Sequence, residues 1–204
     1  IERYEVVQVL GEGGMAVVYR VRHLTLASDH ALKLLTLHSK TVRDRLLKEG
    51  QAQARLRHPN VVAVHDILEI KESPALLMEY VDGPTLRAWL KVHRPTLDEA
   101  LAIFRGILAG VRRAHELGLV HRDLKPANVL MATVDGGVVP KVADFGLVKA
   151  MEDVDGSNTR TGVGMGTPAY MAPEQFRDAK TVDHRADIFS LGCILYALVC
   201  GEPP

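Results

Sequence analysis

The stretch LVHRDLKPANVL, residues 119–130, places a histidine, an arginine, an aspartate, a lysine and an asparagine on a short turn between two apolar runs. The carboxylate of Asp123 can accept a proton from a hydroxyl group or orient it, and the ammonium of Lys125 can neutralise phosphate charge. The amide oxygen of Asn128 is a hard ligand suited to magnesium. Further along the chain, Asp144 ends another apolar run and offers a second carboxylate to the same metal. These residue types at this spacing indicate phosphate chemistry with a divalent cation.

Length and composition restrict the class of protein before other motifs are considered. The 204 residues are 47% hydrophobic and 25% charged, which predicts one globular unit of up to two lobes with a sizeable core. Lysine and arginine number 25, and aspartate and glutamate number 25. This balance gives no reason to expect nucleic acid or a membrane surface as a partner.

Cysteine usage and hydropathy predict a cytoplasmic segment. Cys193 and Cys200 lie seven residues apart in one apolar stretch, two turns along a helix and too far apart to form a bridge. We therefore expect buried free thiols in a reducing compartment. The apolar run from Ile188 to Cys200 is shorter than the roughly 20 residues that a membrane span needs, and no signal peptide is visible at the start.

The first part of the chain is predicted to form a small β lobe with one helix, residues 1–81. Runs of β-branched and other apolar residues alternate with turn residues, and one charged stretch rich in helix formers interrupts them. The expected strands are 4–10, 16–24, 30–37, 61–70 and 75–81, and the expected helix is 41–57. The first three strands are expected to be antiparallel.

The triplet Asp82-Gly83-Pro84 interrupts this pattern, and residues 82–204 are assigned to a second, mainly helical lobe. Thr96 and Glu99 match a capping box at the start of a long helix, and Gly118 is expected to end it. Residues 151–165 are polar, rich in glycine and threonine and without periodicity, which predicts a long mobile loop. We further expect a helix at 85–93, two short strands at 128–132 and 139–144 joined by a turn at 135–137, and a helix at 187–200 that is buried on all sides.

The sequence GEGGMAVVYRV, residues 11–21, contains three glycines whose backbone amides can approach an anion closely. On this motif alone an ordinary hairpin turn is the preferred interpretation. A dinucleotide-binding fingerprint is disfavoured, because its glycines open a helix. Here a β-branched strand follows the glycines, and Ala16 occupies the third glycine position.

Lys33 lies inside an apolar strand, and a buried lysine needs an acidic group or a phosphate as its partner. Glu49, on the helix that follows, is the natural candidate. The alternatives are a strand lysine with its ammonium in water and a glutamate on a solvated helix face. However, a glycine loop, a strand lysine, a helix glutamate, a His-Arg-Asp loop and an Asp-Phe-Gly triplet in this order are very improbable by chance.

With these motifs the chain resembles the eukaryotic-type (Hanks-type) protein kinases from Tyr4 to Pro204, its whole length. The resemblance implies an α+β, protein-kinase-like bilobal fold that binds ATP and Mg²⁺. It implies that Lys33, held by Glu49, contacts the α- and β-phosphates, that Asp123 is the catalytic carboxylate and that Lys125 steadies the γ-phosphate. Magnesium would be held by Asn128 and Asp144.

The resemblance also implies which residues surround ATP. The loop over the phosphates would be Leu10, Gly11, Glu12, Gly13, Gly14, Met15, Ala16, Val17 and Val18. The adenine ring would lie between Val18 and Ala31 on one side and Leu130 on the other, beside the gatekeeper Met78 and the hinge residues Glu79, Tyr80 and Val81. His121 and Phe145 would be structural, and Asp187 would anchor the catalytic loop.

Details of the motifs resemble the bacterial serine/threonine branch. Lys125 in DLKPAN and Thr167 in GTPAYMAPE match that branch, so the resemblance implies transfer of the γ-phosphate of ATP to serine or threonine hydroxyls of protein substrates. In this family the chain continues beyond Gly201-Glu202-Pro203-Pro204 through further helices, so we expect a partial large lobe. The segment would be cytoplasmic, or the cytosolic part of a membrane-anchored receptor kinase.

A regulatory site is implied as well. In the family an arginine at the position of Arg122 lies near the activation segment and can pair with a phosphate. Thr159 and Thr161 match the pair that bacterial kinases of this type phosphorylate on themselves, within a dimer of kinases. Solvated loop threonines are the alternative interpretation.

Two other function classes are alternatives to the enzyme. A pseudokinase or scaffold binds nucleotide or a partner without transfer and usually lacks the strand lysine or one of the two aspartates. Here Lys33, Asp123 and Asp144 are all present. A dinucleotide-dependent oxidoreductase is disfavoured by the strand that follows the glycine loop.

Overall fold

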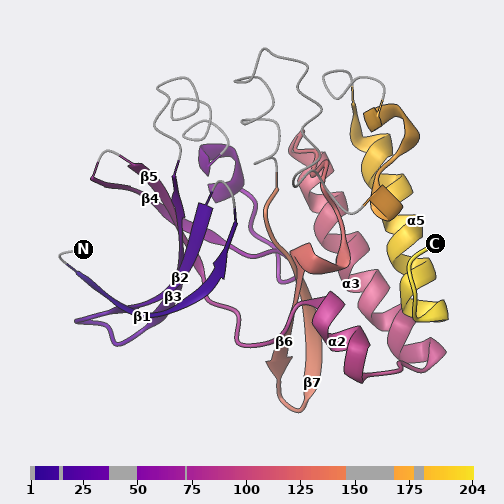
Figure 1. Ribbon diagram of the computed structural model, residues 1–204, viewed down its shortest axis with the longest axis horizontal. Helices are drawn as coiled ribbons and strands as arrows, with labels where there is room; N and C mark the ends of the chain where they lie inside the picture. Colours follow the sequence, from indigo (N-terminus) through magenta and orange to yellow (C-terminus); the bar gives the residue numbers. More distant parts are fainter. Residues whose placement is uncertain (1–2, 14–15, 37–49, 72, 146–167, 177–181) are drawn as a thin grey trace.

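A computed structural model of the chain describes residues 3–13, 16–36, 50–71, 73–145, 168–176 and 182–204. Figure 1 shows a twisted β-sheet on one side of the molecule, two long helices on the other, and a β-hairpin between them. Among the described residues, no helix combines the length and the apolar character that crossing a membrane requires.

The sheet has five antiparallel strands in the order β1-β2-β3-β5-β4. They are β1 (Tyr4–Glu12), β2 (Ala16–His23), β3 (Asp29–Leu35), β4 (Val64–Ile70) and β5 (Ser73–Glu79). All five expected strands are therefore present. Every residue of β5 except its last is buried, which fits its place between β3 and β4. Of the helix expected at 41–57, residues 50–54 are helical, and residues 37–49 lie outside the described part of the chain.

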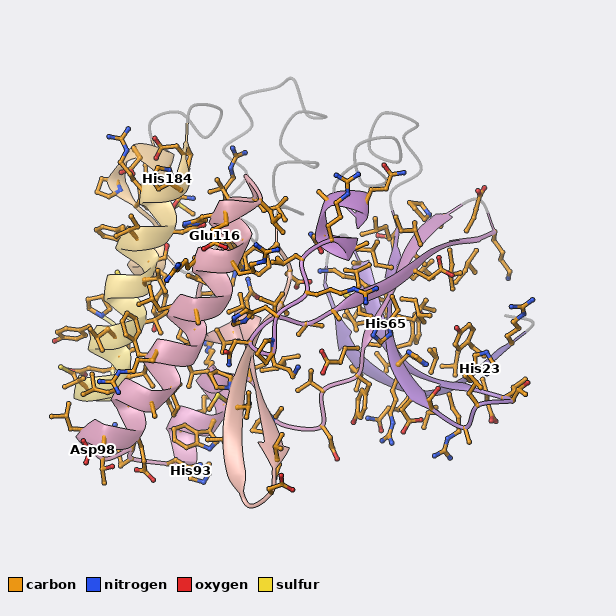
Figure 2. The ribbon with its side chains drawn as sticks, turned by 180° about the vertical axis from the view of Figure 1, so that it is seen from behind. His23, His65, His93, Asp98, Glu116 and His184 are labelled. Atoms are coloured by element: carbon orange, nitrogen blue, oxygen red, sulfur yellow. The ribbon has the colours of Figure 1, made fainter. Side chains whose placement is uncertain are left out.

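The helical side is built on α3 (Leu97–Glu116) and α5 (His184–Cys200). Figure 2 shows His184, at the start of α5, next to Glu116, at the end of α3, so the two helices run antiparallel. Their contact contributes to the main apolar core, which includes Ile103, Ile107, Val111, Leu191, Ile194 and Leu198. The remaining elements are α2 (Leu86–Val92), the 3₁₀ turns η1 (Pro126–Asn128), η2 (Pro168–Tyr170) and η3 (Pro173–Phe176), and the hairpin β6 (Val129–Val134) and β7 (Gly137–Val142).

The signals that predicted the ends of α3 and the hairpin turn are confirmed. The Thr96 hydroxyl accepts a hydrogen bond from the Glu99 N–H at 3.3 Å, and the Glu99 carboxylate accepts one from the Thr96 N–H at 2.8 Å. Gly118 follows the helix with a φ of 74°, the left-handed conformation that glycine adopts without strain. Asp135 and Gly136, between β6 and β7, also have positive φ, which suits a tight hairpin turn.

The helix expected at 187–200 begins earlier and is exposed on one face. It starts at His184 because the Asp183 carboxylate caps it and accepts a hydrogen bond from the Arg185 N–H at 2.9 Å. The expectation of burial on all sides is wrong for this structure. Both cysteines of the helix are free thiols, but only Cys193 is buried, whereas Cys200 is exposed. The helix packs mainly against α3 and η2, and its opposite face exposes four large apolar side chains, those of Ile188, Phe189, Tyr196 and Val199.

The strand expected at 61–70 begins only at Val64, so residues 61–63 do not extend β4 as their sequence predicts. Instead they connect the sheet to the hairpin. The Ala63 carbonyl accepts a hydrogen bond from the Glu79 N–H at 2.8 Å, and the Val62 N–H donates to the Val142 carbonyl at 2.9 Å. Asn60 lies in a turn, and Val61 forms an isolated parallel bridge with Val142 of β7. This segment is therefore a backbone link between the two parts of the molecule.

Small residues on α3 let this link lie close to the helix. A β-carbon added to Gly110 would be 2.7 Å from the Asn60 carbonyl oxygen, and one added to Gly106 would be 2.9 Å from the Asn60 side-chain nitrogen. That nitrogen donates a hydrogen bond to the Pro140 carbonyl at 2.9 Å. The link is thereby held on the same helix that leads to residues 119–130.

Candidate active site

The loop at 119–130 runs from α3 to β6, and its backbone is fixed by one buried carboxylate. Asp187, on α5, is 0% exposed. Its Oδ2 accepts a hydrogen bond from the His121 N–H and its Oδ1 one from the Arg122 N–H, both at 2.8 Å. His115 Nε2, on α3, donates to Oδ2 at 2.8 Å. Two backbone groups of the loop are thus tied to both long helices.

These contacts keep Asp187 ionised. Burial alone would raise the pKa of the Asp187 carboxyl, but the hydrogen bonds from His115 and from the two backbone groups outweigh it and hold the pKa below its usual value. A charged carboxylate in the interior is stable only when such donors surround it.

His121 joins the loop to the segment after β7. Its Nε2 donates to the Ala143 carbonyl at 2.9 Å, and its Nδ1 accepts from the Asp123 N–H at 3.3 Å, so the ring carries its proton on Nε2. The ring also lies against Phe145, with 4.8 Å between centroids. The position of Asp144 relative to Asp123 is therefore set through this imidazole.

Two residues of the site have a backbone conformation that the sequence did not predict. Arg122 has a φ of 68° and Asp144 a φ of 65°. Residues other than glycine rarely adopt this left-handed region, at a cost of about 1–3 kcal/mol each, and such strain concentrates at functional sites. The N–H of Arg122 is bonded to Asp187 and its carbonyl accepts a hydrogen bond from Gln175 Nε2 at 2.7 Å, which offsets the cost there.

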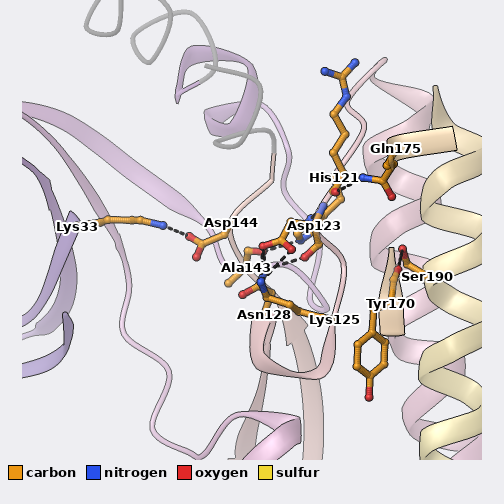
Figure 3. A network of polar contacts seen from close by, with 11 residues as sticks. Lys33, His121, Asp123, Lys125, Asn128, Ala143, Asp144, Tyr170, Gln175 and Ser190 are labelled. Carbon is orange, nitrogen blue, oxygen red and sulfur yellow. Dashed lines mark hydrogen bonds and ion pairs between the residues drawn. The ribbon is translucent and has the colours of Figure 1, made fainter. Parts of the chain in front are cut away.

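Asp123, Lys125 and Asn128 form a close cluster (Figure 3). Lys125 Nζ lies 2.9 and 2.7 Å from the two carboxylate oxygens of Asp123. Asn128 Nδ2 donates to the Asp123 carbonyl at 2.7 Å and to Oδ2 at 3.1 Å. Because the amide nitrogen of Asn128 is turned toward Asp123, its amide oxygen faces away and can act as a ligand.

The cluster continues to Asp144 and from there to the sheet. The Ala143 N–H donates a hydrogen bond to the Asn128 carbonyl at 2.9 Å. Asp144 is the next residue, so this bond holds it close to Asn128. Lys33 Nζ, from β3, lies 2.7 Å from Asp144 Oδ1 (Figure 3). Side-chain exposure is 13% for Lys33 and 34% for Asp144, so the ion pair is partly shielded from solvent.

The charge of Lys33 governs the ionisation of Asp144. Burial would raise the pKa of Asp144, but the ammonium of Lys33 and the hydrogen bond from it lower the pKa to below its usual value. The sequence singled out both residues but gave Glu49 as the partner of Lys33. Glu49 lies outside the described residues, and the contact with Asp144, 111 positions away in sequence, was missed.

The residues expected around adenine come together in one apolar cluster. It contains the buried side chains of Ala31, Met78 and Val81, with Val18 and Leu130 packed against them. Ala31 and Met78 face each other across β3 and β5, and Leu130 comes from β6. The cluster therefore joins the sheet to the hairpin. The hinge residues Glu79 and Tyr80 are half-buried beside it.

The glycine loop joins β1 to β2. The Gly13 N–H donates to the Ala16 carbonyl at 2.9 Å, and a β-carbon at Gly11 would meet nothing within 4 Å. Leu10, Glu12 and Val17 lie in the flanking strands and are exposed or half-buried. Gly14 and Met15 lie outside the described residues. The turn is a hairpin, as its simplest interpretation predicted, and it leaves the backbone of Gly11 open to a ligand.

Arg122 carries donors that the described residues leave unused. Its Nη2 donates to the Val182 carbonyl at 3.1 Å, whereas Nε and Nη1 are buried without a hydrogen-bond partner in the described part of the chain. Buried guanidinium nitrogens are costly when unpaired. Thr159, Thr161 and Thr167 lie outside the described residues.

Comparison with known proteins identifies the family. Residues 4–204 match the family model described as protein kinase domain. The chain belongs to the protein kinase family. It is 40% identical over 214 residues to serine/threonine-protein kinase PknB of Mycobacterium tuberculosis, and 39% identical over 213 residues to PknB of Mycolicibacterium smegmatis. Each match covers 100% of this chain and 33% of the relative, so the chain spans about a third of the length of these kinases.

A solved kinase structure confirms the fold. The crystal structure of Rad53 1-466 in complex with AMP-PNP matches with a TM-score of 0.80 and 30% identity, over 99% of this chain and 49% of that one. The α+β bilobal kinase fold and the resemblance to bacterial Hanks-type kinases, both inferred from the motifs, are confirmed.

Asp187 provides a test of how the loop is held. We expect Asp187→Asn to lower the free energy of unfolding by about 2–5 kcal/mol, because an amide cannot accept from both backbone groups and His115. Asp183→Asn, a capping residue on the same helix that is 46% exposed, is the matched control and should change stability little, since asparagine also caps helices well.

The same variant predicts a pH dependence. The pKa of Asp187 is depressed in the folded state. The ionised carboxylate therefore contributes its full share to the free energy of unfolding above the unfolded carboxyl pKa of about 3.9, and this share is lost as the pH falls through the folded pKa. Urea unfolding from pH 7 to pH 2 should therefore show a shallower loss of stability in Asp187→Asn than in the wild type. Equal slopes would contradict the ionised, hydrogen-bonded state of Asp187.

Proposed function

We propose that the chain is the catalytic part of an ATP-dependent protein serine/threonine kinase. One observation carries the proposal: Lys33 from the sheet meets Asp144 after β7 at 2.7 Å, and Asp144 is joined through Ala143 to the cluster of Asn128 and Asp123. A cation, two carboxylates and an amide from three segments, namely β3, the loop at 119–130 and the residues after β7, therefore converge on one place between sheet and helices. The names of the PknB relatives support the reaction class.

The apolar cluster of Val18, Ala31, Met78, Val81 and Leu130 supports the nucleotide site. A flat apolar ring such as adenine can be enclosed between the sheet and the hairpin, with its polar edge toward the backbone of residues 79–81. The phosphates would then extend toward the glycine loop and Lys33. The related Rad53 structure holds AMP-PNP, which supports a nucleotide as ligand.

Asp144 and Asn128 fit Mg²⁺ as a cofactor. Both offer hard oxygen ligands, and protein magnesium sites commonly use one or two carboxylates and complete the shell with substrate phosphates and water. This agrees with the described part of the chain holding no cluster of three or more His, Cys, Asp or Glu residues that could bind a metal alone. When bound, the ion would neutralise charge on the β- and γ-phosphates.

The protein groups divide the chemistry between them. Asp123 orients the serine or threonine hydroxyl of a protein substrate and accepts its proton, while the hydroxyl oxygen forms a bond to the γ-phosphorus and the bond from that phosphorus to the β-phosphate oxygen breaks, which releases ADP. Lys125, 2.7 Å from Asp123 in this structure, is placed to neutralise the transferred phosphoryl group. Lys33 would exchange part of its contact with Asp144 for the α- and β-phosphates.

We also propose the division into lobes at residues 1–81 and 82–204. The chain changes partners at this point: Glu79 still pairs with His30 in the sheet, whereas Thr85 forms a bridge with Leu130 in the hairpin. The stretch between them is the hinge. Glu49 is proposed as a further partner of Lys33.

Asp123→Asn tests the catalytic assignment. We expect phosphate transfer from ATP to a generic basic protein to fall by roughly 10²–10⁴-fold, because the asparagine cannot accept the proton. Asp135→Asn, in the exposed turn between β6 and β7, is the matched control, since asparagine tolerates its positive φ. If Asp123→Asn still bound nucleotide and phosphate transfer were undiminished, a scaffold would be favoured, and the transfer would be due to another protein in the sample.

Regulation by autophosphorylation of Thr159 or Thr161 within a pair of kinase molecules is part of the proposal. Nε and Nη1 of Arg122 are buried and find no acceptor within the described part of the chain. This supports the proposal, because a phosphate could accept hydrogen bonds from both. We expect mass spectrometry of active protein to find phosphate at one of these positions. Changing Thr159 and Thr161 to alanine together should lower kinase activity without altering nucleotide affinity. Thr25→Ala, in an exposed turn, is the control and should leave kinase activity unchanged. Full kinase activity with Thr159 and Thr161 both unphosphorylated would contradict the role of Arg122 as the residue that binds the regulatory phosphate.

A further inference from the structure

Two consecutive residues of the hinge are held from opposite sides of the molecule. Glu79 ends β5, where the pairing of the sheet stops. Lys141 Nζ, from β7, lies 2.8 Å from Glu79 Oε1 and 3.1 Å from Oε2. The side chains are 16% and 29% exposed, so the ion pair is partly desolvated. The Ala63 N–H also donates to Glu79 Oε2 at 3.3 Å.

Tyr80 is held from the sheet. The guanidinium carbon of Arg20, on β2, lies 4.5 Å from the centroid of the Tyr80 ring, within the range of a cation–π contact. Arg20 Nε donates to Asp29 Oδ2 at 3.2 Å, and its Nη2 donates to the same oxygen. Arg22 lies 3.3 Å from the other carboxylate oxygen. Asp29 therefore fixes the guanidinium over the ring before any ligand binds.

The two contacts act on adjacent backbone units. Side chains of consecutive residues in an extended chain point to opposite sides, so Glu79 can reach the hairpin while Tyr80 reaches the sheet. Since β5 ends at Glu79, the backbone that follows is no longer positioned by the sheet. That backbone, residues 79–81, is the one to which the proposed function assigns the polar edge of adenine.

We propose that Arg20 and Lys141 are positioning residues for the nucleotide site: they hold Tyr80 and Glu79 from opposite lobes and thereby fix the hinge backbone that binds adenine. This inference rests on the proposed function. Neither residue touches the nucleotide itself. They restrict the conformations of the hinge before the ligand binds, so less conformational entropy is lost on binding. This raises the affinity for the nucleotide without a new contact to it.

The effect should be confined to the adenine end of the ligand. Arg20→Met and Lys141→Met keep side chains of similar length and remove the charge. We expect each to raise the Kd of both adenosine and ADP by about three- to tenfold, and by the same factor for the two, because both carry the adenine ring. In steady-state kinetics the KM for ATP should rise by this factor, and kcat at saturating ATP should change less.

Conservative and compensating variants separate positioning from a purely structural role. Lys141→Arg keeps the ion pair, so this variant should bind both ligands as tightly as the wild type does. Lys141→Glu places two carboxylates together and should weaken binding further, and addition of Glu79→Lys should recover affinity, because the pair is re-formed with reversed charges. Arg112→Met, which removes a solvent-exposed ion pair with Glu116 on α3, is the matched control and should bind as the wild type does.

Isothermal titration calorimetry of the purified protein with adenosine and with ADP decides the question, with melting temperatures confirming that each variant is folded. Equal losses for both ligands, restored by Lys141→Arg and by charge reversal, support the proposal. Unchanged affinities, or a loss for ADP without a loss for adenosine, overturn it. If the wild type binds both ligands and transfers phosphate, and the variants bind with the same affinities, only the positioning role is contradicted. If the wild type binds neither adenosine nor ADP, the proposed function is contradicted as well.

Discussion

The buried carboxylate of Asp187 is the constraint on which the rest of the site depends. It accepts hydrogen bonds from two successive backbone groups, of His121 and Arg122, and from His115 on the neighbouring helix. Because the bonds to the loop come from its backbone, they fix its path whatever its side chains do. From this fixed point His121 positions Asp123 and the segment leading to Asp144. The strained φ of Arg122 is tolerated because these bonds over-determine the loop.

In the described part of the chain, contacts of different kinds couple the sheet to this centre. Residues 60–63 provide a backbone ladder between β5 and β7. The ion pair of Lys33 with Asp144 joins a strand of the sheet to the end of the hairpin, and the ion pair of Glu79 with Lys141 does the same beside the hinge. Ion pairs at partly exposed sites are individually weak.

The sequence was informative where local rules apply, and less so where long-range contacts decide. The capping box of Thr96 with Glu99, the turn at Asp135 and the existence of all five strands followed from residue types and spacing. The motifs singled out Lys33, Asp123, Asn128 and Asp144, and the structure brings these polar residues together. The motifs did not predict the left-handed φ of Asp144 or the pairing of Lys33 with it, because both depend on how distant segments pack. Residues 61–63 were predicted to belong to the strand that became β4 but lie before it, since β-branched residues favour a strand without choosing its partner.

The central claim is that Asn128 and Asp144, with Lys33 from the sheet, form one site for a magnesium nucleotide in front of Asp123. A crystal structure of the protein with Mg²⁺ and AMP-PNP tests it most directly. We predict a metal ion with oxygen ligands from Asn128 and Asp144 at about 2.0–2.1 Å, adenine against the apolar cluster of Ala31 and Leu130, and the γ-phosphate facing Asp123. A nucleotide bound elsewhere, or a metal that neither Asn128 nor Asp144 ligates, would contradict the account.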